Sequence, residues 1–269
     1  MGVINITPDS FSADGLIKSK TNSTRRALSL AQKFITQGAD IIDVGGESTR
    51  PGSKRISIKE EIARVIPAIA QLAKKIKAPI SIDTYKPLVA KRALDAGAVI
   101  VNNIMGTNPD RRLLKMVRDY DASIVLMHMR GTPRTMQKNI HYNNLITEIR
   151  NSLRNSVEKC LEMGIKSDRI IIDPGIGFAK TIQHNLEIIN RLNEFHALKT
   201  PILIGPSRKS FIGRILDADV SNRLLGTMAA VSASILRGAH IVRVHDVKKT
   251  KEVVTITDAI INQNYNNLS

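Results

Sequence analysis

Short apolar segments that alternate with longer amphipathic ones constrain the fold of this chain more than any other feature. Isoleucine and valine are frequent in the apolar segments, and their lengths suit buried strands. Several of these segments lack period-two alternation, which is typical of a parallel sheet covered on both faces. The expected strands are 2–7, 41–46, 79–84, 99–104, 123–129, 170–175, 201–206 and 241–246.

The amphipathic segments predict helices, because apolar residues recur in them at spacings of three and four. The segment 57–76 shows this pattern with Ile62, Val65, Ile66, Ile69 and Leu72. The expected helices are 22–38, 57–76, 86–96, 109–119, 141–164, 182–197, 210–238 with a break near 217–221, and 247–262.

Eight strand–helix units in 269 residues predict an α/β fold, a single (β/α)8 TIM barrel. A doubly wound open sheet is the alternative, but no Gly-x-Gly-x-x-Gly motif follows the first strand. No linker rich in Pro, Gly or Ser divides the chain. We therefore expect residues 1–269 to form one domain.

Composition excludes several classes of protein. The sequence has no run of 18 apolar residues, so we expect no membrane-spanning helix and no membrane partner. It shows no basic stretch followed by an apolar one at its start, which argues against a signal peptide. A single cysteine, Cys160, excludes a disulfide framework and fits a reducing compartment. These features predict a cytoplasmic protein.

The net charge of +16 admits nucleic acid, a membrane surface or an anionic metabolite as partner. The 40 Lys and Arg residues are dispersed along the chain, and aromatic residues make up only 3% of it. Little is therefore available to stack against bases, and we expect no nucleic-acid partner. A positive field that attracts a phosphorylated small molecule is the favoured interpretation.

Polar residues recur where the expected strands end. The segment "RIIIDPGIGF" (169–178) shows the pattern, since a buried strand ends on a carboxylate fixed by a Pro-Gly turn. In a barrel all the carboxyl ends of the strands meet at one mouth. Independent helix caps would favour Ser and Thr and would not require Lys, Arg and His. The residues concerned are Asn5, Asp43, Glu47, Asp83, Asn102, His128, Asp173, Ser207, Lys209, Arg243 and His245.

The residue types indicate what this mouth could bind. Two carboxylates and an amide, those of Asp83, Asn102 and Asp173, could read the edge of a flat heterocycle with several N–H groups. The donors and positive charge of Lys209, Arg243 and His245 suit a phosphate or a ring carbonyl.

Each residue taken alone also has a structural explanation. Asp173 could cap the next helix, Asn102 could be a satisfied core amide, and Lys209 could be a solvated helix start. We interpret His128 and Asp43 as structural. The loops 7–15 and 45–55, rich in Gly, Ser, Pro and Asp, could act as lids or be ordinary surface loops.

With these residues in place, the chain resembles the bacterial-type dihydropteroate synthases over nearly its whole length. The resemblance implies a pterin-binding (β/α)8 barrel, Mg²⁺ as cofactor, a homodimer and a place in folate biosynthesis as the sulfonamide target. The implied reaction joins 6-hydroxymethyl-7,8-dihydropterin diphosphate to 4-aminobenzoate. The matching motifs, in chain order, are "GVINITPDSFS", "IIDVGGESTRPG", "SIDTYKP", "MHMRGTPRTMQ", "DPGIGFAKT", "GPSRKSFIG" and "RVHDV".

The same resemblance implies roles for individual residues. Arg243 and His245 match positions that hold diphosphate, Thr49 lies near it, and Asn5 matches the position associated with Mg²⁺. Catalytic roles are implied for Arg243, His245 and Lys209. Substrate contacts are implied in the pterin pocket for Asp83, Asn102, Asp173 and Lys209, and on the aminobenzoate side for Arg50, Pro51, Phe178 and Ser210. Ile104, Met127 and Ser207 are further implied substrate contacts.

The chain departs from the family pattern at three places, and three other functions remain as alternatives. Asn103 stands where Asp is usual, Ala13 and Asp14 alter the first loop, and Ala179 stands where Gly is common. A pterin-binding methyltransferase domain shares the implied fold, but lacks "SRKS" and "ESTRPG". A non-catalytic paralogue that sequesters pterin and a basic RNA-binding barrel are the other two alternatives.

Overall fold

The computed structural model describes residues 1–7, 20–48 and 53–263, with only the backbone described for residues 20–22. Strands β1 to β6 pair in parallel and in sequential order, and β7 pairs in parallel with β8. The strands are β1 Gly2–Asn5, β2 Ile42–Gly45, β3 Ile80–Asp83, β4 Ile100–Asn103, β5 Ser123–Met127, β6 Ile170–Asp173, β7 Leu203–Ile204 and β8 Ile241–Val242.

Single parallel bridges join these two sheets at both edges. Gly2 bridges to Val244 beyond β8, and Ile172 of β6 bridges to Ile202 before β7. The eight strands therefore follow one another around a ring, closed at two places by a bridge instead of a continuous ladder. The predicted (β/α)8 barrel is confirmed, and the sequential strand order excludes the doubly wound sheet.

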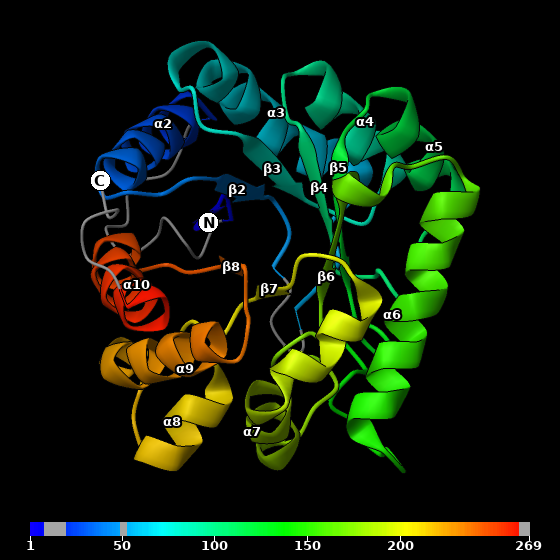
Figure 1. Ribbon diagram of the computed structural model, residues 1–269. Coiled ribbons are helices and arrows are strands. Elements are labelled where there is room, and N and C mark those ends of the chain that lie inside the picture. Colours follow the sequence, from blue (N-terminus) through cyan, green and yellow to red (C-terminus); the bar gives the residue numbers. More distant parts are fainter. Residues whose placement is uncertain (8–19, 49–52, 264–269) are drawn as a thin grey trace.

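Helices surround the strands on the outside, as Figure 1 shows in a view along the barrel. Helix α9 packs beside α10, and α2 beside α3. The helices are α2 Lys20–Thr36, α3 Ile58–Lys75, α4 Pro87–Asp95, α5 Arg111–Asp119, α6 Leu145–Glu162, α7 Ile182–Asn190, α8 Ser210–Leu216, α9 Leu224–Leu236 and α10 Val247–Asn262. Among the residues that the structure describes, no helix is long and apolar enough to cross a membrane.

Strand residues alternate between the helix layer and the barrel interior. Ile170 and Ile172 of β6 belong to the large core shared with the helices, whereas Ile171 packs inside the barrel. Near the amino ends the interior is apolar, with Met1, Ile100, Val125, Ile171 and Leu203 in one buried cluster. Toward the carboxyl ends it holds the buried polar residues Asp43, Ser81, Asn102 and Asp173. The polar layer rests on an apolar one.

Side-chain caps set several helix boundaries. The Asn144 side chain accepts the Thr147 N–H, so α6 begins at Leu145 and not at the expected residue 141. The expected helix 182–197 instead ends at Asn190 and continues as the 3-10 segment Leu192–Leu198. The predicted break near 217–221 is confirmed, because Asp217 adopts φ = 47° and ends α8.

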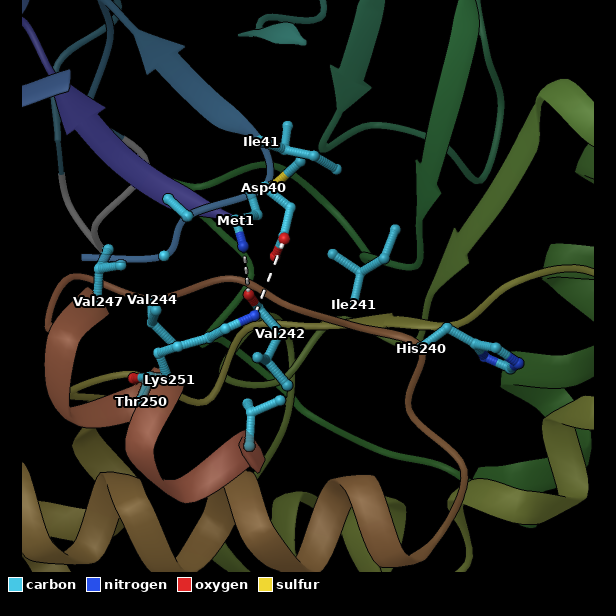
Figure 2. Close-up of a pocket in the computed structure, with 13 residues that line it drawn as sticks. Met1, Asp40, Ile41, His240, Ile241, Val242, Val244, Val247, Thr250 and Lys251 are labelled. Atoms are coloured by element: carbon cyan, nitrogen blue, oxygen red, sulfur yellow. Dashed lines mark hydrogen bonds and ion pairs between the residues drawn. The ribbon is translucent and has the colours of Figure 1, made fainter. Parts of the chain in front are cut away.

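A cavity of about 260 Å³ lies at the amino end of the barrel, opposite the predicted site. Figure 2 shows the Met1 ammonium donating to the Val242 carbonyl at 3.0 Å, and Lys251 facing Asp40 at 4.0 Å. None of the predicted site residues lines this cavity. The functional site must therefore be sought at the other end.

Candidate active site at the carboxyl end of the barrel

Arg243 joins the polar residues inside the mouth of the barrel. Its Nε donates to Asp43 Oδ2 at 2.7 Å, and its Nη2 donates to Asp83 Oδ2 at 2.7 Å. Asp43 also accepts from Asn102 Nδ2 at 3.3 Å. The Arg243 side chain is 22% exposed while Asp43 is fully buried, so the guanidinium spans from the interior toward the open mouth. The interpretation of Asp43 as structural fits these contacts.

Within this cluster, burial and the opposite charge nearby act against each other on the pKa values of Asp83 and Arg243. Burial raises the pKa of the Asp83 carboxyl, and the adjacent Arg243 charge opposes that rise. For Arg243, burial acts to lower the pKa, but the carboxylates of Asp43 and Asp83 outweigh it and the pKa is raised. The guanidinium therefore keeps its charge at every physiological pH.

Asp173 ends β6 and is held by the turn that follows. Its Oδ1 accepts the Gly175 N–H at 2.7 Å, and burial raises the pKa of its carboxyl to about 6. Gly175 has φ = 76°, and a Cβ at that position would lie 2.0 Å from the His128 carbonyl oxygen. Only glycine fits this close approach, so the Pro-Gly turn fixes the direction of Asp173.

Apolar side chains form one wall of the mouth. Phe178 lies with Ile104 and Met127 in a buried cluster completed by Met129, Met136 and Ala179. The Lys209 ammonium lies 4.2 Å from the centre of the Phe178 ring, which is cation–π contact distance. Burial lowers the pKa of Lys209 to about 8. A flat ring could thus pack against an apolar wall that also carries a cation.

Ser207 and His245 form a second polar pair. Ser207 Oγ accepts the His245 backbone N–H at 3.3 Å and lies 3.0 Å from His245 Nδ1. A hydroxyl that donates to Nδ1 leaves the imidazole proton on Nε2, which can then donate to a ligand. Burial, and then the Arg243 charge, lower the pKa of His245 to about 4. At neutral pH His245 therefore offers a neutral donor.

The remaining predicted residues differ in how the structure presents them. Asn5 ends β1 beside Gly45 and Asp83, since a Cβ on Gly45 would lie 3.4 Å from Asn5 Oδ1 and 3.5 Å from Asp83 Cβ. Ser210 is exposed at the start of α8, directly after Lys209. Thr49, Arg50 and Pro51 lie outside the described residues, so their predicted roles stay predictions.

Two buried lysines of the mouth are absent from the sequence-based prediction. Lys180 Nζ contacts His128 Nδ1 at 3.0 Å and donates to the Phe178 carbonyl at 2.8 Å. Lys86 Nζ donates to the carboxylates of Glu47 and Glu61, each at 2.6 Å. Both belong to the quoted motifs "DPGIGFAKT" and "SIDTYKP", which is the only signal that could have pointed to them.

Asn103, one of the departures from the family pattern, has a local task. Its side-chain oxygen accepts the Met105 N–H at 3.0 Å, and the residue is 1% exposed. It therefore shapes the turn after β4, next to Ile104 of the apolar wall. An aspartate could accept the same bond, so this departure leaves the turn intact.

Known proteins identify the family. The model of the pterin binding enzymes matches residues 1–245. This chain belongs to the pterin binding enzyme family. Family members named dihydropteroate synthase include that of Synechocystis sp., 45% identical over 97% of this chain and 89% of that protein, and that of Bacillus subtilis, 44% identical over 98% and 88%.

Solved structures of pterin binding enzymes share the fold. The Yersinia pestis dihydropteroate synthase in a sulfonamide drug complex has a TM-score of 0.91 at 37% identity, covering 97% of this chain and 94% of that one. The Clostridium difficile enzyme, crystallised in the presence of pteroic acid, has a TM-score of 0.89 at 41% identity, with coverage of 97% and 95%. The Thermus thermophilus enzyme with 4-aminobenzoate has a TM-score of 0.85 at 34% identity, with coverage of 97% and 93%.

Proposed function

We propose that this chain is a dihydropteroate synthase of folate biosynthesis. It transfers the dihydropterin-methyl group of 6-hydroxymethyl-7,8-dihydropterin diphosphate to 4-aminobenzoate and releases diphosphate. The observation that carries the proposal is the mouth of the barrel, where buried carboxylates, an Arg–carboxylate bridge and a lysine over an aromatic ring surround an apolar wall. Relatives of that name, 40 to 45% identical over nearly the whole chain, support it.

The pterin ring is recognised by edge and face. The Asp173 carboxylate and the Asn102 amide supply acceptors and a donor for the amino-pyrimidine edge, with Asp83 beside them. Ile104 and Met127 line the ring face, and Lys209 donates to the ring. Burial raises the pKa of the Asp83 and Asp173 carboxyls, and N–H groups of the bound pterin would stabilise their ionised form.

The reaction needs stabilisation of departing negative charge more than a base. The bond between the pterin methylene carbon and the diphosphate oxygen breaks, and its electron pair leaves with diphosphate. The electron-rich dihydropterin stabilises the resulting cation, and the arylamine lone pair then forms the new C–N bond. The nitrogen finally loses one proton to the released diphosphate or to solvent. Arg243 and the Nε2 donor of His245 hold the leaving diphosphate, and Ser207 orients His245.

We propose that Mg²⁺ binds together with the diphosphate of the substrate. The described residues contain no cluster of three or more His, Cys, Asp or Glu side chains that could hold a metal alone. The Asn5 amide oxygen at the end of β1 fits the usual way of binding Mg²⁺, with one protein oxygen, substrate phosphates and waters. When bound, the ion would neutralise charge on the leaving group, and Asn5 would hold it.

The second substrate binds on the outer side of Phe178. Ser210, exposed at the start of α8, belongs to this side, and the resemblance adds Arg50 and Pro51, which lie outside the described residues. The arylamine is neutral and requires no general base to attack a cation. Excluding water from the cation is the other requirement, because hydrolysis would compete with capture.

We also propose that the enzyme is a homodimer that works in the cytoplasm without nucleic acid or membrane. An apolar groove of about 520 Å³ runs between α7, α8 and α9. The exposed side chains Leu186, Ile215, Leu216 and Leu236 line it, and Leu225 nearby is 81% exposed. Apolar surface of this kind marks an interface. Leu225→Glu should shift the mass measured by sedimentation from dimer to monomer, and an unchanged mass would contradict this face.

The direct test of function is product formation. Purified protein, Mg²⁺ and the pterin diphosphate are mixed with labelled 4-aminobenzoate, and labelled dihydropteroate and diphosphate are quantified. We expect both in equal amounts. Absence of product together with pterin binding would indicate the non-catalytic paralogue, and methyl transfer from a methylated folate would indicate the methyltransferase alternative.

A further inference from the structure

Lys180 is a buried cation that the reaction described above does not use. The residue is 3% exposed and follows the turn that carries Phe178. Its Nζ contacts His128 Nδ1 at 3.0 Å, the Phe178 carbonyl at 2.8 Å and the His128 carbonyl at 3.4 Å. The ammonium thus links the loop after β5 to the loop after β6.

None of these three partners is a carboxylate, which is unusual for a buried lysine. Three neutral acceptors match its three N–H donors, and the His128 ring is itself 2% exposed and kept neutral by burial. Burial lowers the pKa of Lys180 to about 7, and the Asp173 carboxylate is the principal group that opposes this. Structural linkage alone could be met by a neutral side chain, so the charge needs its own explanation.

The turn held by Lys180 has an uncommon backbone. Gly177 has φ = 81° and Ala179 has φ = 51°, so residues on both sides of Phe178 occupy the left-handed region. The loop after β5 holds this turn at two further points, since Gln137 Nε2 donates to the Gly177 carbonyl at 3.0 Å and the Tyr142 hydroxyl donates to the Ala179 carbonyl at 3.1 Å. An anchored, strained turn at a site keeps its side chains in one direction.

We propose that Lys180 is a positioning residue of the pterin site: its buried ammonium fixes the turn that carries Phe178 and supplies positive charge that keeps Asp173 ionised. The inference rests on the proposed function, in which Asp173 accepts N–H groups of the pterin.

The charged groups around the two residues support this role. The charges of Lys209, Lys180 and Arg243 all oppose the rise that burial causes in the pKa of Asp173. Burial lowers the pKa of Lys180, the Asp173 charge raises it, and the charges of Arg130 and Lys209 lower it further. Near pH 6, where Asp173 titrates, Lys180 still carries its proton, because its own pKa is about 7. Loss of the Lys180 charge must therefore raise the pKa of Asp173.

The test is the pH dependence of pterin affinity, measured by calorimetry with 6-hydroxymethylpterin between pH 5 and 8. Lys180→Gln keeps donors for the loop carbonyls and removes the charge, whereas Lys180→Arg keeps the charge. Lys77→Gln, an exposed lysine near the amino end of β3, is the matched control for charge loss. All three melting temperatures are recorded first.

For Lys180→Gln we expect the midpoint of the affinity profile to rise by about one pH unit. At pH 6 this corresponds to about fivefold weaker binding than wild type, and the difference should vanish above pH 7, where wild-type Lys180 also loses its proton. Lys180→Arg and Lys77→Gln should keep the wild-type midpoint.

An unshifted profile in folded Lys180→Gln would overturn the inference. If that variant does not fold, Lys180→Arg decides, since a shifted midpoint there would contradict a role that depends on charge. A wild-type protein that binds no pterin at any pH would instead defeat the proposed function itself, so the two failures are distinguishable.

Discussion

Asp173 shows how one residue of this site combines stability and binding. Its carboxyl is 6% exposed, it accepts the Gly175 N–H, and burial raises its pKa from 3.8 to about 6. Because the folded protein holds this proton more tightly than the unfolded chain, the group lowers stability as pH rises from about 4 to 6. The ionised Asp173 carboxylate therefore lowers the stability of the free protein, and N–H groups of a bound ligand would offset this loss.

Asp173→Asn should weaken pterin binding without unfolding the barrel. Losing a charge-assisted hydrogen bond costs about 1.5–3 kcal/mol, and the loss of affinity on going from pH 7 to pH 5 should also disappear. Asparagine can still accept the Gly175 N–H, so the melting temperature should hold. Calorimetry and thermal melts at both pH values measure this, and unchanged affinity would remove Asp173 from the pocket.

At the scale of elements, the loops after the strands are tied to one another by buried ions. Lys86, just after β3, binds Glu47 beyond β2 and Glu61 of α3, each at 2.6 Å, and donates to the Ile56 carbonyl at 2.9 Å. Burial acts to lower the pKa of Lys86, but the bonds with Glu47 and Glu61 outweigh it and the pKa is raised. This cluster holds Glu47 and Ile56, near the two ends of the loop 45–55, against the barrel.

Lys86→Met should destabilise the protein by about 3–5 kcal/mol, because two buried carboxylates lose their cation. Lys91→Met breaks the exposed ion pair with Asp95 and serves as the control with little effect. Urea unfolding of wild type and both variants measures this, and a Lys86→Met protein as stable as wild type would contradict the mechanism.

The sequence predicts the elements better than it predicts the contacts between their ends. Apolar periodicity locates every strand and most helix boundaries, because it reports burial on one face. The strand-end pattern also predicts Asp83, Asn102, Asp173, Lys209 and Arg243 at one mouth. The sequence pattern does not predict the roles of Lys180 and Lys86. Their partners His128 and Glu47 lie 52 and 39 residues away, and neither lysine is the last residue of a strand. Only folding brings such pairs together.

Over the whole molecule, the net charge is +16, and the proposed substrate is an anion. If this field captures the pterin diphosphate, kcat/KM should fall with added salt while kcat changes little. The screening length is about 10 Å at 0.1 M and about 3 Å at 1 M, which removes the long-range field before the direct Arg243 contacts. Titration with an inert monovalent salt at fixed free Mg²⁺ measures this. A kcat/KM independent of salt would make the charge incidental to capture.

The central claim is that the carboxyl-end mouth of the barrel performs the transfer, and Arg243→Lys tests it most directly. Lysine keeps one positive charge beside Asp43 and Asp83 but loses the guanidinium fork that we propose to hold diphosphate. Arg118→Lys, exposed on α5, is the matched control. In a single-turnover assay with labelled 4-aminobenzoate, the account predicts that Arg243→Lys forms dihydropteroate roughly a hundredfold more slowly than wild type, and that Arg118→Lys matches wild type. A folded Arg243→Lys protein with the wild-type rate would contradict the account.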